Sequence, residues 1–200
     1  MNKGRLEAFS DGVIAIILTI MVLELRAPEM AEPEALRPLA PAFLSYVMSF
    51  VYLGIYWNNH HHLLQAVRQV DGRILWANLH LLFWLSLIPF VTSWMGQTHF
   101  ARVPVAAYGV ALLAAAIAYW ILTIALVSRH GKDSQLGRAL GRDFKGKISI
   151  VIYALAIPGA FWNARFSCAL YGVVTLLWLV PDRRIERILS EARDESSRPG

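Results

Sequence analysis

Residues 5–25 of the chain read RLEAFSDGVIAIILTIMVLEL. From Phe9 onward the segment is almost wholly apolar, and a helix of about 20 such residues spans the hydrocarbon core of a bilayer. An arginine, a serine and an aspartate occupy its leading end. Charge at that depth is costly, so these residues mark a functional or a structural site. The length of the run and the lack of a small-residue cleavage site favour a retained membrane helix over a signal peptide.

The composition of the whole chain agrees with an integral membrane protein. Of its 200 residues, 56% are hydrophobic and 16% are charged, whereas about 25% are charged in an average soluble domain. Five further apolar runs begin near residues 39, 73, 103, 148 and 166, and Pro89 is expected to kink the third run. We therefore predict an all-α, polytopic fold with six transmembrane helices in residues 1–181, followed by a polar cytoplasmic tail, 182–200.

The loop charges predict the orientation of these spans. With six spans, 15 of the 19 Lys and Arg residues fall on the side that holds both termini, and four fall on the other side. Positive charge concentrates in cytoplasmic loops, so we expect both termini in the cytoplasm of a multi-pass protein of the cell membrane. The basic residues are better suited to anionic lipid head groups than to nucleic acid, and we predict no nucleic-acid partner.

The first helix has two different surfaces when its residues are placed about 100° apart. Ile16, Thr19 and Leu23 fall within one narrow stripe, and Ile20 lies beside it. Asp11 lies about 120° from the centre of the stripe. The acidic residue and the aliphatic stripe are therefore expected to face different neighbours.

At its leading end the chain resembles a known family. The residues that carry the resemblance are Arg5, Phe9, Ser10 and Asp11, which form an RxxxFSD signature, followed by Trp57, the histidines 60–62, and Asn78. This signature resembles that of the transmembrane protein 175 family of cation channels. The resemblance covers the first three helices in detail, whereas the last three helices match only in hydropathy.

The resemblance implies a homotetramer that conducts potassium, with the first helix of each subunit lining a central pore. It also implies that Ile16 forms the constriction, with Thr19 and Leu23 on successive turns, and that the RxxxFSD residues bind neighbouring helices. The chain lacks a TVGYG filter. A ring of aliphatic side chains would then exclude water when narrow and admit a partly dehydrated ion when wider.

Asp11 and the three histidines allow more than one interpretation. Asp11 is either a proton or ion relay, or a buried carboxylate that is satisfied by Trp57, His61 or Asn78, and we favour the second. Consecutive helical residues point about 100° apart, so the histidines 60–62 do not converge on one ion. We predict no metal site and no cofactor. One histidine is expected in the signature network, and a histidine there could give weak proton sensitivity.

The sequence lacks the common enzyme signatures GxSxG, the Walker phosphate loop and HExxH. We therefore predict a potassium-permeable channel and not an enzyme. Two other classes stay open. One is a secondary transporter or proton-coupled carrier that uses Asp11, Glu24 and a histidine. The other is a membrane scaffold that does not conduct.

Overall fold

The computed structural model describes residues 2–28, 31–67, 69–130 and 144–179. Within these ranges every regular element is helical and no strand occurs, which confirms the predicted all-α class. The predicted tail, 182–200, and most of the polar loop at 128–147 lie outside the described residues.

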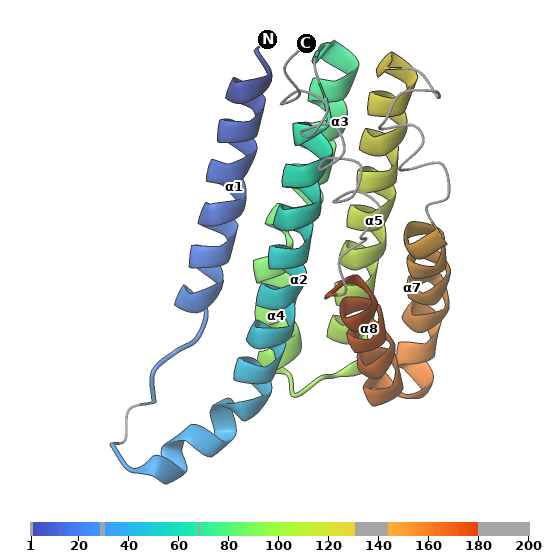
Figure 1. The fold of residues 1–200 in the computed structure, drawn as a ribbon. Coiled ribbons are helices and arrows are strands. Elements are labelled where there is room, and N and C mark those ends of the chain that lie inside the picture. The colour runs from blue at the N-terminus through green and yellow to red at the C-terminus, as the bar shows by residue number, and fades with distance from the viewer. Residues whose placement is uncertain (1, 29–30, 68, 131–143, 180–200) are drawn as a thin grey trace.

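The helices run up and down the bundle, side by side (Figure 1). They are α1 (Lys3–Leu23), α2 (Ala40–Gln65), α3 (Gly72–Ser86), α4 (Ile88–Gln97), α5 (Arg102–His130), α7 (Phe144–Trp162) and α8 (Ala164–Leu179), with a 3-10 helix η1 (Pro33–Leu39) before α2.

Five of the six predicted spans are long and apolar enough to cross a membrane. These spans are α1, η1 with α2, α3 with α4, α5, and α7. The sixth, α8, is apolar but has 16 residues, which gives a length of about 24 Å at 1.5 Å per residue. The hydrocarbon core is about 30 Å thick, so the described part of α8 is shorter than a full span.

The predicted kink in the third span is a break between two helices. Helix α3 ends at Ser86, α4 begins at Ile88, and Pro89 lies in the first turn of α4. Proline lacks a backbone N–H and is tolerated there because the first N–H groups of a helix have no partner within it. The break interrupts the α-helix at Leu87, inside the apolar segment Gly72–Gln97.

Two groups of helices build the core. Helix α5 packs against α3 and α7, and α7 pairs with α8, whereas α1 rests on α2, α3 and α4. Buried alanines on α5 such as Ala115 and Ala118 let neighbouring helices approach closely, as small residues do in membrane bundles. Helix α1 lies at one edge of the bundle, with its amino-terminal end at the top of Figure 1.

Candidate functional site

Helix α1 has one face buried in the bundle and one face exposed. The buried residues are Leu6, Ser10, Ile14, Ile17 and Met21, which recur every three or four positions and so lie on one side of the helix. This face contacts α2, α3 and α4. The opposite face contacts no helix of the same chain closely enough to be buried, and it carries the predicted stripe.

The stripe residues are all exposed in the single chain. The exposed fraction is 58% for Ile16, 42% for Ile20 and 78% for Leu23, and Thr19 is also exposed. The Thr19 hydroxyl donates a hydrogen bond to the Ile16 carbonyl at 2.9 Å, so its oxygen keeps acceptor capacity toward the exposed side. The helix therefore presents three aliphatic side chains and one hydroxyl oxygen on its outward face.

A buried polar network joins α1 to α2 and α3 on the opposite side. The Asn78 amide Nδ2 donates to Ser10 Oγ at 2.9 Å, and Asn78 Oδ1 lies 2.7 Å from His60 Nε2. Ser10 Oγ in turn donates to the Leu6 carbonyl at 2.9 Å. Because Ser10, His60 and Asn78 are at most 1% exposed, each depends on the others for its hydrogen bonds.

Asp11 lies outside this network and contacts Trp57. The Trp57 indole Nε1 donates to Asp11 Oδ1 at 3.0 Å, and the Trp57 ring stacks on His61 with centroids 5.9 Å apart. Asp11 is partly exposed. Of the three partners that the sequence offered for Asp11, the structure places Trp57 in contact with it. The carboxylate points away from the aliphatic stripe, as the angular positions predict.

The two remaining signature residues, Arg5 and Phe9, take part neither in the Ser10–Asn78 network nor in the Asp11–Trp57 contact. Arg5 and Phe9 are exposed in the single chain, Phe9 by 50%. Both lie on α1, Phe9 directly before Ser10 and Arg5 five residues before it, yet they point to the outside of this bundle. Their exposure leaves them available to a neighbouring molecule or to lipid.

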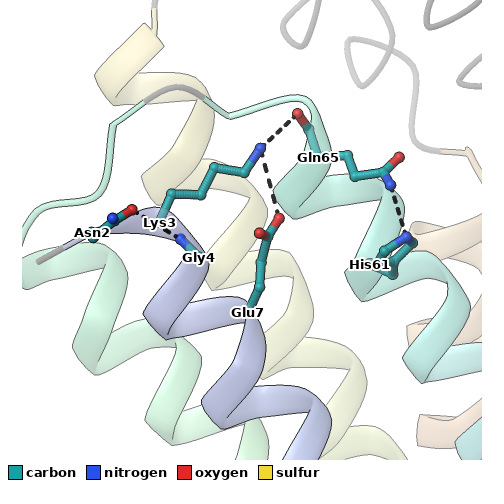
Figure 2. Close-up of polar contacts among 6 residues, drawn as sticks. All are labelled: Asn2, Lys3, Gly4, Glu7, His61 and Gln65. Atoms are coloured by element: carbon teal, nitrogen blue, oxygen red, sulfur yellow. Dashed lines mark hydrogen bonds and ion pairs between the residues drawn. The ribbon is translucent and has the colours of Figure 1, made fainter.

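The amino-terminal end of α1 is tied to the end of α2 (Figure 2). Lys3 Nζ donates to the Gln65 carbonyl at 3.0 Å and lies 3.6 Å from a Glu7 carboxylate oxygen. A cation is favourable at this place because the carboxyl end of a helix carries partial negative charge. Gln65 Nε2 lies 2.8 Å from His61 Nε2, so His61 belongs to this end of the bundle.

The other end of α1 is tied to α4, beside a groove. Ser93 Oγ donates to Glu24 Oε2 at 2.8 Å. The groove has a volume of about 720 Å³ and is lined by α1 residues, including Ile16 and Ile20, and by α4 residues, including Phe90. Between Asp11 and Glu24, α1 is therefore held by apolar packing on one side and borders open space on the other.

The described residues contain no group of three or more His, Cys, Asp or Glu side chains that could hold a metal. The adjacent histidines illustrate the reason, because His60 turns toward Asn78 and His61 toward Gln65.

Comparisons with known proteins place the chain in a family. A family model described as the endosomal/lysosomal potassium channel TMEM175 matches residues 5–89. A potassium channel of Chryseobacterium sp. (strain P1-3) is 55% identical over 191 residues, which cover 96% of this chain and 100% of that protein. A potassium channel of Streptomyces collinus is 30% identical over 193 residues, covering 89% and 92%. The chain belongs to the TMEM175 family.

A solved structure agrees with this assignment. The crystal structure of a lysosomal potassium-selective channel TMEM175 homolog from Chamaesiphon minutus matches this chain with a TM-score of 0.77 and 27% identity, over 90% of this chain and 97% of that one. The predicted family is therefore confirmed. TMEM175 proteins are membrane ion channels, so this chain is a channel and not an enzyme.

Sequence reasoning missed three contacts of the TMEM175 signature helix. It left open which histidine joins the signature network and gave His61 as one candidate partner of Asp11, whereas His60 is the histidine that bonds to Asn78. It also gave no partner for Lys3 or Glu24, whose contacts lie 62 and 69 positions away in the sequence. No local pattern indicates contacts of this kind, because they depend on how α2 and α4 are rotated against α1.

Proposed function

We propose that the chain forms a homotetrameric, potassium-permeable channel of the cell membrane, with both termini in the cytoplasm. Four α1 helices surround the pore, and Ile16, Thr19, Ile20 and Leu23 line it. The two bacterial relatives and the Chamaesiphon minutus homolog, all of which are potassium channels by name, support the choice of ion. Anionic and zwitterionic lipids surround the assembly, and the positive loops face the cytoplasmic head groups.

The observation that carries the proposal is the division of α1 into two faces. The face with Ser10 and Ile14 is fully buried in the chain's own bundle. The face with Ile16 and Leu23 is more than half exposed. If several copies assemble around an axis at this exposed face, the stripe of each α1 packs against the other copies and the buried network is undisturbed.

In this assembly the constriction acts by hydration. Rings of isoleucine and leucine offer an ion no ligands, so passage depends on how much water the ring admits. The Thr19 oxygen, one turn beyond Ile16, replaces part of the hydration shell. Such a pore discriminates among cations less sharply than a filter of carbonyl oxygens.

The test is the substitution Ile16→Asn, with currents recorded from purified protein in planar bilayers. Wild-type currents should reverse near the potassium equilibrium potential. A polar side chain at the constriction lowers the dehydration barrier, and about 1.4 kcal/mol corresponds to a tenfold rate, so we expect a several-fold higher conductance and weaker discrimination against sodium.

Val22→Asn is the matched control. Val22 lies on the same helix and is 48% exposed, but it is about 100° from the stripe, so its substitution should leave selectivity unchanged. Unchanged currents in Ile16→Asn would contradict the pore assignment, and a monomeric protein would contradict the assembly. Slow, saturable, ion-coupled flux would instead support the carrier that uses Asp11, Glu24 and a histidine.

A further inference from the structure

Glu24, at the carboxyl end of α1, has an oriented carboxylate. Glu24 follows Leu23 directly and caps the carboxyl end of the helix. Ser93 Oγ donates to Glu24 Oε2 at 2.8 Å, and Gln97 Nε2 donates to Ser93 Oγ at 2.8 Å. These two hydrogen bonds, from side chains one turn apart on α4, fix the position of one carboxylate oxygen. The described residues provide no hydrogen-bond donor to Oε1, and Glu24 is exposed.

The negative charge at this position is not neutralised. Among the described residues, the ion pairs are Lys3 with Glu7 and Arg129 with Asp71, and neither includes Glu24. The last turn of α1 holds no basic residue. The carboxyl end of a helix carries about half a negative charge, which adds to the charge of the carboxylate.

The sequence after α1 adds further negative charge. Residues 24–37 contain four glutamates and two arginines, Arg26 and Arg37. Arg26 is exposed and is the basic residue nearest to Glu24 in the sequence. The outer end of α1 is therefore an acidic region, and Glu24 is the carboxylate that lies next to the proposed pore stripe.

We propose that Glu24 is a cation-binding residue, four copies of which form a ring that collects monovalent cations at the pore entrance opposite the amino terminus. This inference rests on the proposed tetramer with α1 at its axis. Rings of carboxylates attract cations in channels of several kinds, and charged entrances raise the local concentration of the permeating ion. Ser93 and Gln97 act as positioning residues, because they hold the carboxylate beside the groove that Ile16 and Ile20 also line.

The size of the effect follows from Coulomb's law with screening. With about 10 Å from each of four carboxylates to an ion on the axis in water, the local cation concentration rises about threefold at 0.1 M salt and about eightfold at 0.01 M. At 1 M salt the Debye length is about 3 Å and the enrichment nearly vanishes. The carboxylate ring therefore has a specific signature, which is an effect on conductance that salt removes.

The experiment measures unitary potassium conductance of the full-length channel in bilayers of neutral lipid, in symmetric 0.01, 0.1 and 1 M KCl. Glu24→Gln should lower the conductance about threefold at 0.1 M and about eightfold at 0.01 M, with no change at 1 M. Ser93→Ala should give a smaller loss with the same salt dependence. Glu32→Gln is the matched control, because Glu32 is an exposed carboxylate of the same loop that is not at the end of α1, and it should have a smaller effect.

Three results would overturn the ring. One is a current that responds to Ile16→Asn but keeps wild-type conductance in Glu24→Gln at all three salt concentrations. Another is an equal loss in Glu24→Gln and Glu32→Gln, which would assign the effect to the loop as a whole. A wild-type protein without potassium current would refute the proposed function and the ring together, whereas the first two results leave the channel itself in place.

Discussion

Replacing Asn78 with leucine tests whether the buried network holds α1 in the bundle. Leucine branches at Cγ as asparagine does and is somewhat larger, so Asn78→Leu removes the amide without opening a cavity. The substitution leaves His60 Nε2 and Ser10 Oγ without the partners they have at 2.7 and 2.9 Å. Both groups are almost completely buried, so water does not replace the lost hydrogen bonds.

The expected cost follows from these two lost hydrogen bonds. A buried polar group that loses its partner costs about 1–3 kcal/mol. Within membranes, hydrogen bonds between helices contribute about 0.6 kcal/mol on average and up to about 1.7, because the unfolded state in the bilayer also finds partners. We therefore expect Asn78→Leu to lower the free energy of unfolding by about 1.5–4 kcal/mol. The coupling energy between Asn78 and Ser10 should be about 0.6–1.7 kcal/mol.

The assay is a double-mutant cycle of Asn78→Leu and Ser10→Ala, with unfolding by sodium dodecyl sulfate followed by circular dichroism. Asn59→Leu is the control, since the Asn59 amide donates to the Ile55 carbonyl of its own helix and its loss should cost less than about 1 kcal/mol. A coupling energy of zero, or an Asn78→Leu protein as stable as Asn59→Leu, would refute the view that this network fixes α1.

Two further predictions concern helix packing and the amino-terminal contact. A Cβ added to Gly96 would lie 2.7 Å from the Ala42 Cα, whereas one added to Gly172 meets nothing within 4 Å. Gly96→Ala should therefore lower the free energy of unfolding by about 1–3 kcal/mol, and Gly172→Ala should not. Thermal unfolding in detergent measures both variants, and equal midpoints would contradict this prediction. Lys3→Met removes the cation from the Gln65 carbonyl and should cost about 0.5 kcal/mol, an effect that disappears in high salt; a salt-independent loss would contradict the electrostatic explanation.

Hydropathy and periodicity predicted much of the fold because membrane helices are apolar over a fixed length. The six apolar runs correspond to α1, α2, the pair α3 and α4, α5, α7 and α8. The break near Pro89 was also predictable, since the missing N–H of proline acts locally. The 3-10 helix η1 was not anticipated, because apolar composition alone does not determine where a helix begins or ends.

The candidate site was predictable in its angular layout and not in its contacts. The separation of Ile16 from Ser10 by about 120° around α1 follows from the helical period of a single segment, so no knowledge of neighbours was needed. The choice of His60 over His61 is different. These adjacent residues differ by about 100° around α2, and only the packing of α2 against α3 decides which of them faces Asn78.

The distribution of polar contacts along α1 indicates how the proposed pore helix can be held at both ends and still move in its middle. Lys3 joins α1 to α2 at one end, Ser10 and Asp11 join it to α2 and α3 near the same end, and Glu24 joins it to α4 at the other end. Asp11 and Glu24 are 13 positions apart, a span of about 20 Å, and over this length α1 rests on apolar side chains. Apolar packing is non-directional, so the middle of α1 can shift without breaking a hydrogen bond while its two ends stay in place. The proposed constriction at Ile16 lies in this middle part, beside the groove that α1 forms with α4, so its width can change by displacement of α1 toward α4 with the polar contacts at both ends intact.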